Sequence, residues 1–196
     1  MIDVADDAAR IIKWIKADPV RWDLLGHVRE LGLPDCWVAA GFVRNMVWNR
    51  LHGEKSPRSG DVDVIWFDRD DLAEARDQAL GARLQRFAPG IDWSVKNQAR
   101  MHRRNGDAPY ASAEDAMRFW PETATAIAVR RTVDDRCELI APFGVNDLMA
   151  LTLRPAGAFV DRKRAIFDNR IREKRWLQNF PKLRVADRRF NEQLPA

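Results

Sequence analysis

Two aspartates near the first third of the chain, Asp61 and Asp63, have the spacing of a metal-binding pair. They lie in the segment DVDVIWFD, which alternates and then becomes apolar, as a partly buried β-strand does. Residues two apart on a strand point to the same face, so the two carboxylates repel each other unless a cation lies between them. Carboxylate oxygens suit Mg²⁺ (or Mn²⁺), which leaves positions open for phosphate oxygens. The pair therefore predicts divalent-metal chemistry on a phosphate substrate, whereas an isolated pair would more simply be the exposed start of a strand.

A candidate phosphate-binding turn precedes the aspartates. The segment AAGFVRN runs from a short strand-like stretch into a helix that begins near Gly41. The free N–H groups of a first helical turn bind phosphate, and Arg44 could pair with phosphate through two hydrogen bonds. Asn45 follows it and is expected to belong to the same nucleotide-binding turn. Taken alone, Gly41 would be a turn glycine and Arg44 a surface ion pair.

The segment after the aspartates, IDWSVKNQARMH, alternates over its whole length and predicts a strand over residues 91–102. One face of this strand would carry only polar residues, namely Asp92, Ser94, Lys96, Gln98, Arg100 and His102. Beside two carboxylates, such a row offers cations to a triphosphate and amides to a base or sugar. We therefore expect Lys96, Gln98 and Arg100 to bind a nucleotide, although a solvated face of an edge strand explains the pattern equally well.

The elements that would position these residues predict a mixed α/β protein. In chain order the expected elements are helices over 6–17 and 19–31, a strand ending at Gly41, a helix over 42–53, a loop over 54–60, a strand over 61–68, a helix over 71–87, a strand over 91–102, a short helix over 113–122 with Ser112 as its N-cap, a hairpin over 123–142 that turns at Asp134-Asp135, and helices over 144–155 and 159–180. This order predicts a twisted mixed sheet flanked by helices, with helical N- and C-terminal extensions.

Three parts of the chain follow from this order. We expect N-terminal helices over residues 1–34, a catalytic core over 35–153 and a basic C-terminal helical extension over 154–196, together forming one compact unit. Arginine and lysine dominate the last forty residues, and such a cluster can attract nucleic acid or nucleotide phosphates. A solvated helix face is the simpler explanation of the same cluster.

Composition narrows the class of protein further. The chain has 196 residues, of which 46% are hydrophobic and 32% are charged, with a net charge of +4, as in an ordinary globular protein. No apolar run reaches the length of a membrane span, and the acidic start MIDVADDAAR lacks the layout of a signal peptide, so a cytoplasmic protein is expected. Cys36 and Cys137 form no CxxC pair and are expected to be reduced core residues. The three scattered histidines predict no zinc site.

Several motifs together resemble a known group of enzymes. AGFVRN followed by DVDV is similar to the glycine motif and paired aspartates of the DNA polymerase β-like nucleotidyltransferase superfamily, near the GGxVRD…DxD layout of CCA-adding enzymes and poly(A) polymerases. WNRLHG, DVDVIWFD, VKNQARMH, PYAS, WPETATAIAVR and APFGVNDLMAL look like a largely uncharacterised bacterial nucleotidyltransferase family, over most of residues 35–180. The resemblance implies the polymerase-β-like fold, a divalent metal and nucleotidyl transfer.

The glycine motif departs from the superfamily pattern. Ala40 replaces the first glycine of the pair, and the bulky Phe42 follows Gly41, which could reshape the phosphate loop. Asn45 stands where CCA-adding enzymes have an aspartate.

The third carboxylate of the superfamily, which comes from a neighbouring strand, has no obvious counterpart. The first position to consider holds Ser94, while Asp92 lies on the same expected face and Glu138 lies in the hairpin strand CELIAP. Glu138 is slightly favoured because its neighbours Cys137 and Leu139 would point to the core. The expected metal ligands are thus Asp61, Asp63 and either Glu138 or Asp92.

These features predict a metal-dependent transfer of a nucleoside monophosphate from a triphosphate to an acceptor hydroxyl, with release of pyrophosphate. The acceptor stays open between a small molecule, a protein and an RNA end. The alternative is a catalytically degenerate protein that binds nucleotide or RNA without chemistry, which the altered glycine motif and the uncertain third carboxylate would favour.

Overall fold

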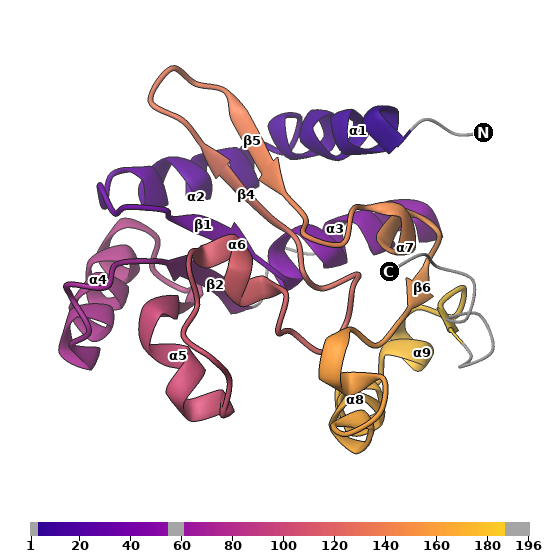
Figure 1. The fold of residues 1–196 in the computed structure, drawn as a ribbon. Helices are drawn as coiled ribbons and strands as arrows, with labels where there is room; N and C mark the ends of the chain where they lie inside the picture. Colours follow the sequence, from indigo (N-terminus) through magenta and orange to yellow (C-terminus); the bar gives the residue numbers. More distant parts are fainter. Residues whose placement is uncertain (1–3, 55–60, 187–196) are drawn as a thin grey trace.

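The computed structural model describes residues 4–54 and 61–186, and the expected loop over 54–60 lies outside them except for Glu54 (Figure 1). A five-stranded sheet has the order β3-β2-β1-β4-β5. Its strands are β1 Trp37–Ala39, β2 Asp61–Trp66, β3 Asp92–Asn97, β4 Ala128–Arg131 and β5 Cys137–Ile140. β2 and β3 run parallel, and the other neighbouring pairs are antiparallel. The sheet is therefore mixed, as predicted.

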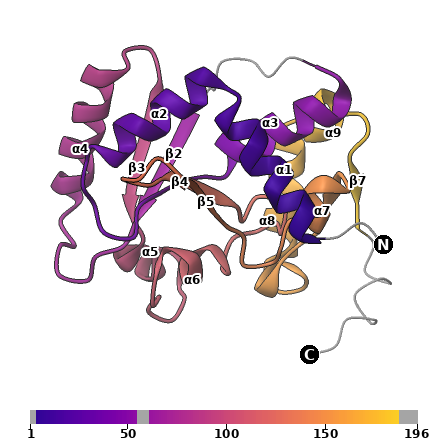
Figure 2. The ribbon, with the colours of Figure 1, turned by 90° about the horizontal axis from the view of Figure 1, so that it is seen from above.

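Helices cover both faces of this sheet. They are α1 Val4–Lys16, α2 Pro19–Arg29, α3 Gly41–His52, α4 Glu74–Phe87, α5 Gln98–Asn105, α6 Ala113–Met117, α7 Asn146–Met149, α8 Arg164–Glu173 and α9 Trp176–Asn179, with a 3₁₀ turn η1 at Gly157–Phe159 and a small second sheet of β6 Thr152–Leu153 and β7 Arg184–Val185. α1, α2 and α4 pack against one face, while α5 and α6 lie on the other side (Figure 2). Among the described residues, none of the helices has the length and apolar character that a membrane crossing requires.

The alternation in β2 decides which face holds the core. Val62 and Val64 are fully buried under the helices of one face, where they belong to the main hydrophobic cluster. The residues between them, Asp61 and Asp63, therefore point to the opposite face. Further along that opposite face Ile65 is buried in a smaller cluster together with Met117 of α6.

Local signals explain several element ends. Asp18 caps α2 by accepting a hydrogen bond from the backbone N–H of Arg21, and Ser112 caps α6 as predicted. α3 ends at Gly53, whose φ of 78° gives the left-handed C-cap that glycine adopts without strain.

The predicted strand over 91–102 is wrong in its second half. β3 ends at Asn97, whose side chain accepts a hydrogen bond from the N–H of Ala99 (2.9 Å) and so caps α5. Alternation cannot distinguish these two conformations over so short a stretch, and the asparagine cap decides for the helix. Gln98 and Arg100 consequently do not share a strand face with Lys96.

The predicted C-terminal helices are also shorter than expected. The stretch over 144–155 forms only α7 before the chain turns into β6, and the stretch over 159–180 is divided into η1, α8 and α9. Between α8 and α9, Arg175 has a positive φ of 49°. This break allows Trp176 to be buried edge-on against Trp48 of α3, with ring centroids 5.7 Å apart. Burial of the indole therefore outweighs continuation of the helix.

Candidate active site

The two aspartates of β2 lie side by side at the edge of a polar cavity. Asp61 is exposed, and Asp63 is partly buried beside Ser94 of β3, its partner in the parallel register. Burial and the neighbouring charge of Asp61 raise the pKa of Asp63, while the Ser94 hydroxyl and the cations Arg44 and Lys174 act in the opposite direction. The raised pKa means that the charge of this carboxylate is incompletely compensated by the protein alone.

Glu138 is not part of this site, so the slightly favoured prediction for the third carboxylate is wrong. β5 lies three strands away from β2 in the sheet, which corresponds to about 14 Å at the usual strand spacing. The Glu138 carboxylate instead pairs with Arg130 of β4, with N–O distances of 2.6 and 2.7 Å. The sequence could not reveal this because it does not state the order of the strands.

Asp92 is the nearer candidate of the two. It lies directly opposite Asp61 on the adjoining strand, and both are exposed. Within residues 4–54 and 61–186, however, no three Asp, Glu, His or Cys side chains converge closely enough to hold one metal ion. Glu54 also lines the cavity but does not converge with Asp61 and Asp63, so an ion held by these two would take its remaining ligands from water and phosphate oxygens.

The turn before α3 gives the site a backbone surface. Ala40 joins β1 to α3 with φ 52° and ψ −117°, a conformation that glycine adopts far more easily, and its carbonyl accepts a hydrogen bond from Arg44 N–H (2.9 Å). A Cβ added at Gly41 would meet only side-chain atoms of Asn45 (3.5 Å) and Arg44 (3.6 Å), which is ordinary contact. No other part of the chain packs closely against Gly41, and the space beside it is part of the cavity.

Arg44 is a fixed cation rather than a mobile surface residue. Only 7% of it is exposed, and its guanidinium lies between the rings of Trp48 (5.0 Å) and Trp176 (4.6 Å). It donates hydrogen bonds to Thr125 Oγ1 (3.1 Å) and to the side-chain oxygen of Asn45. Burial lowers the pKa of Arg44 to about 10, so the group still carries its charge at neutral pH.

The C-terminal region adds two cations that the sequence interpretation treated only as part of a basic cluster. Arg170 of α8 and Lys174, the residue that caps the C-terminus of α8, line the same cavity as Asp61 and Asp63. Both therefore bring positive charge to the cavity that holds the aspartates. The signal that could have found these residues is their spacing of four, which places both on one face of a helix.

Glu122 fixes the position of Arg170. It is fully buried, and its Oε1 accepts a hydrogen bond from Arg170 Nε (2.8 Å). Its second oxygen, Oε2, has no hydrogen-bond partner among the described residues. The charge of this buried carboxylate is therefore compensated by Arg170, and the same contact holds the guanidinium in place.

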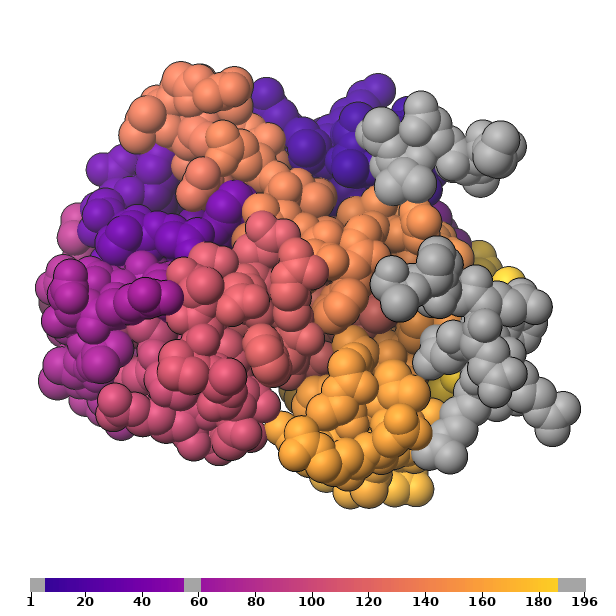
Figure 3. Space-filling view, viewed as in Figure 1, coloured from indigo at the N-terminus to yellow at the C-terminus, as the bar shows by residue number. Residues whose placement is uncertain are grey.

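Two adjoining cavities meet at Asp63. The first, of about 570 Å³, holds the α3 turn and the α8 cations, and its lining includes Gly41, Arg44, Asn45, Asp61, Asp63, Arg170 and Lys174. The second, of about 450 Å³, lies between β3, α5 and the segment after α6, and its lining includes Asp63, Ser94, Lys96, Gln98, Met101, Arg104 and Trp120. Ala40, Asp63, Thr125 and Arg170 line both. The surface is hollowed between α5 and α8, where the second cavity opens (Figure 3).

The predicted nucleotide-binding residues are therefore divided between the two cavities. Gly41, Arg44 and Asn45 line the first, and Lys96 and Gln98 line the second. Arg100 lines neither, so the structure does not support its predicted role. Its guanidinium forms a salt bridge with the buried carboxylate of Asp77 on α4, away from the aspartates of β2.

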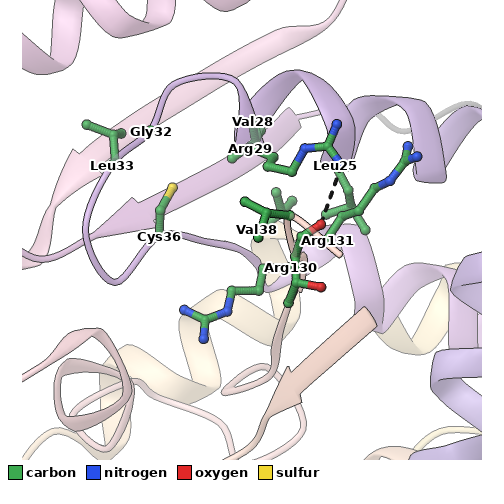
Figure 4. A pocket seen from close by; sticks show the side chains of 11 residues that line it. Leu25, Val28, Arg29, Gly32, Leu33, Cys36, Val38, Arg130 and Arg131 are labelled. Atoms are coloured by element: carbon green, nitrogen blue, oxygen red, sulfur yellow. Dashed lines mark hydrogen bonds between the residues drawn. The ribbon is translucent and has the colours of Figure 1, made fainter. Parts of the chain in front are cut away.

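A third hollow, of about 310 Å³, lies between α2 and the strands β1 and β4 (Figure 4). Its walls are mainly apolar, with Leu25, Val28 and Val38, and Arg29 at its rim donates a hydrogen bond to the Thr132 carbonyl (3.4 Å). No carboxylate lines it. It therefore lacks the groups that could hold a metal ion or move a phosphoryl group.

Comparisons with known proteins identify the family of the chain. The sequence profile of a protein family described as Nucleotidyltransferase matches residues 26–185. A solved structure described as revealing a CCA-adding enzyme head domain is 32% identical with a TM-score of 0.80, and the match covers 90% of this chain and 94% of that one. No curated protein sequence matches the chain.

Larger enzymes share the fold. A CCA-adding enzyme in complex with CTP (22% identity, TM-score 0.54) is covered over 39% of its length by 85% of this chain. The Thermotoga maritima CCA-adding enzyme complexed with tRNA (22% identity, TM-score 0.52) is likewise covered over 39% by 87% of this chain. The profile match and the similarity to the head-domain structure both rest on most of the chain, which therefore belongs to this nucleotidyltransferase family.

Proposed function

We propose that this nucleotidyltransferase moves a nucleoside monophosphate from a triphosphate to an acceptor hydroxyl in the presence of Mg²⁺ or Mn²⁺, releasing pyrophosphate. The observation that carries the proposal is the first cavity, in which Asp61 and Asp63 face the cations of α3 and α8. Transfer of this kind depends chiefly on positioning and on neutralising charge, and the cavity provides groups for both.

The triphosphate would lie between the α3 turn and α8. Gly41, the first residue of α3, lines the cavity, and the open space beside it would allow a phosphate to approach the free N–H groups at the start of the helix. Arg44, Arg170 and Lys174 supply positive charge around that position. Because Arg44 and Arg170 are held by Thr125 and Glu122, little reorganisation would be needed when the nucleotide binds.

The aspartates would hold the metal ion. Two carboxylates on one strand face, one of them with a raised pKa, form a donor set that fits a hard divalent cation. When bound, such an ion would neutralise charge on the phosphates and increase the acidity of the acceptor hydroxyl. Asp61 and Asp63 would fix the position of the reacting phosphate relative to the cations.

A second candidate function is nucleotide binding without turnover. It is favoured by the finding that, in the described part of the chain, no three potential ligand side chains converge closely enough to hold a metal ion. The two functions differ in whether pyrophosphate is released.

The test is pyrophosphate release from each of the four ribonucleoside triphosphates. The protein is incubated with Mg²⁺, with Mn²⁺ or with excess EDTA, together with a mixture of small hydroxyl compounds or with RNA, and transfer of α-phosphate label is followed in parallel. Asp63→Ala is the inactive control, and Asp23→Ala, at an exposed position outside the cavities, is the matched active control. Metal-dependent release that Asp63→Ala abolishes supports the proposal. Metal-dependent nucleotide binding without release would support the second candidate instead.

A further inference from the structure

The second cavity has its own unpaired charge. Lys96 and Arg104 both line it, and neither forms an ion pair with any residue of the described ranges. Asp63, at the boundary with the first cavity, is the carboxylate in its lining. Two cations without carboxylate partners in a concave site favour an anionic group on the ligand.

Apolar groups form the rest of the wall. Ile65 is buried at the bottom, and Met101 and Trp120 are partly buried at the sides. Trp120 belongs to the cluster that packs on this face of the sheet, so its ring is held in place. A flat apolar part of a ligand would lie against this wall while the anionic group pairs with Lys96 and Arg104.

The position of the cavity indicates its role. In nucleotidyl transfer the attacking and leaving oxygens lie roughly in line on opposite sides of the α-phosphorus. The first cavity would hold the leaving pyrophosphate near the α3 turn, and the second cavity, which has a different set of walls, meets it at Asp63. A hydroxyl that enters from the second cavity would thus approach the α-phosphorus from a direction other than that in which pyrophosphate leaves.

We infer that the second cavity is the acceptor site, and that the acceptor is a small phosphate ester with a ring and a free hydroxyl. The inference rests on the proposed function. The acceptor oxygen forms a bond to the α-phosphorus, the bond from that phosphorus to the α–β bridging oxygen breaks, and pyrophosphate leaves with the bonding pair while the hydroxyl proton passes to solvent.

Size and charge favour a small acceptor over a polymer. A volume of about 450 Å³ is that of a small-molecule site. Two unpaired cations suffice for one phosphate group, whereas proteins that bind nucleic acid tightly contact roughly 6–10 phosphates. An RNA end or a protein acceptor is therefore an outcome that the experiment must be able to detect.

The test uses the full chain labelled with ¹⁵N and phenyl phosphate as the probe, because it carries only a phosphate and a ring. Phenyl phosphate is expected to shift the Trp120 indole and Gln98 amide signals to saturation, while benzyl alcohol, which lacks the charge, is not. Lys96→Met and Arg104→Gln should each weaken this binding about fivefold or more, equivalent to the loss of one charge pair. Arg103→Gln, an exposed neighbour outside the cavity, should change it less than about twofold.

Binding of ATP with Mg²⁺, followed by the same signals, tests the nucleotide site independently of the acceptor site. ATP should shift the Gly41 amide and the Trp176 indole in the wild type and in Lys96→Met alike, and should bind together with phenyl phosphate. If phenyl phosphate shifts only the Gly41 and Trp176 signals, or binds Lys96→Met and Arg104→Gln as well as it binds the wild type, the acceptor site is overturned while the nucleotide site stands. If ATP fails to bind, the proposed function falls and the acceptor role falls with it.

A transfer assay decides between acceptor classes. Label that passes from the α-phosphate to small hydroxyl-bearing phosphate esters, with a higher KM in Arg104→Gln, supports the inference. Label that passes only to an RNA end or to a protein overturns it.

Discussion

Two carboxylate sites lie on opposite faces of the β2–β3 pair, and their surroundings differ in kind. On one face, Asp77 of α4 is 3% exposed and accepts hydrogen bonds from Trp66 Nε1 (2.7 Å) and from the Asn97 N–H (3.1 Å). Its charge is matched by the guanidinium of Arg100. On the other face, burial and then the repulsion of Asp61 raise the pKa of Asp63, and Ser94, Arg44 and Lys174 offset this only in part.

This difference separates a structural carboxylate from a functional one. Asp77 joins α4, β2, β3 and α5 in a network in which each partner is a donor from the protein. Asp61 and Asp63 instead repel each other, and the charge of Asp63 is only partly compensated by Ser94, Arg44 and Lys174. Asp77 is also the most deeply buried of the three, and it is the one whose charge is matched by donors of the protein.

The largest expected difference between the two carboxylate sites is in the rate of nucleotide transfer. Asp61→Asn and Asp63→Asn should each lower the rate of nucleotide transfer by about a thousandfold or more, because a neutral amide cannot replace a metal-binding carboxylate. Neither should lower the free energy of unfolding in metal-free buffer, since each removes a repulsive charge. Transfer assays and urea unfolding measure the two quantities. Loss of stability comparable to the loss of activity would contradict a functional role for the pair.

Asp77→Asn should show the opposite pattern. Removing this charge leaves the mostly buried Arg100 without its partner, which should lower the free energy of unfolding by about 3 kcal/mol. Once the protein is folded, nucleotide transfer should persist, because Asp77 lies outside both cavities that meet at Asp63. Asp23→Asn, at an exposed site, is the control and should change stability by less than about 0.5 kcal/mol. A change below about 1 kcal/mol for Asp77→Asn would mean that the network contributes little.

The sequence pattern correctly placed Asp61 and Asp63 on the face away from the core, but it assigned Arg100 to the wrong site. The alternation of DVDVIWFD placed Val62 and Val64 in the core and so exposed the aspartates, and the α3 turn was found from AGFVRN. Arg100 was misassigned because the alternation of residues 91–102 continues past the point where Asn97 starts a helix. Residue types along the chain cannot show which of two carboxylates an arginine will reach.

The sequence also could not predict the order of the strands or the contacts between segments far apart in the chain. Glu138 was slightly favoured because Cys137 and Leu139 would point to the core, but β1 and β4 lie between its strand and β2. Arg170 and Lys174 line the cavity together with Trp176, which follows the positive φ of Arg175 and is buried against Trp48 of α3. Such contacts depend on tertiary packing, which no local pattern encodes.

Glu122 combines features of both sites. It is fully buried, as Asp77 nearly is, but only one of its two carboxylate oxygens has a hydrogen-bond partner among the described residues. Glu122→Gln should lower the free energy of unfolding by about 2 kcal/mol, because the hydrogen bond from Arg170 loses its charged acceptor. Bound ATP should restore part of that loss, since its phosphates replace the missing negative charge near Arg44 and Arg170. Thermal unfolding with and without ATP measures both effects. The control Glu114→Gln removes only a surface ion pair and should lower the free energy of unfolding by at most about 0.5 kcal/mol. ATP should stabilise this variant as much as it stabilises the wild type.

The pH dependence of stability provides a subtler test of the Asp63 site. Because the pKa of Asp63 is raised in the folded state, the folded protein holds this proton more tightly than the unfolded chain. Its contribution is therefore present below the ordinary pKa of an aspartate and is lost as pH rises through the raised pKa. In metal-free buffer, Asp63→Asn should gain stability relative to the wild type between about pH 4 and pH 7. Addition of Mg²⁺ at neutral pH should reduce the difference, and a difference that is independent of both pH and metal would contradict the assignment.

The smallest expected effect concerns the backbone beside the functional carboxylates. Ala40 occupies a positive φ of 52° with ψ −117°, whereas Ala39, one residue earlier, lies in regular β1. Ala40→Gly should therefore raise the free energy of unfolding by about 1 kcal/mol, because glycine adopts this conformation without strain. Ala39→Gly should lower the free energy of unfolding by about 1 kcal/mol. Ala39 is fully buried in a regular strand, where glycine relieves no strain and only makes the unfolded chain more flexible. Urea unfolding of both variants measures the contrast. If both substitutions destabilised the protein equally, the Ala40 side chain would have to contribute packing that outweighs its strained backbone.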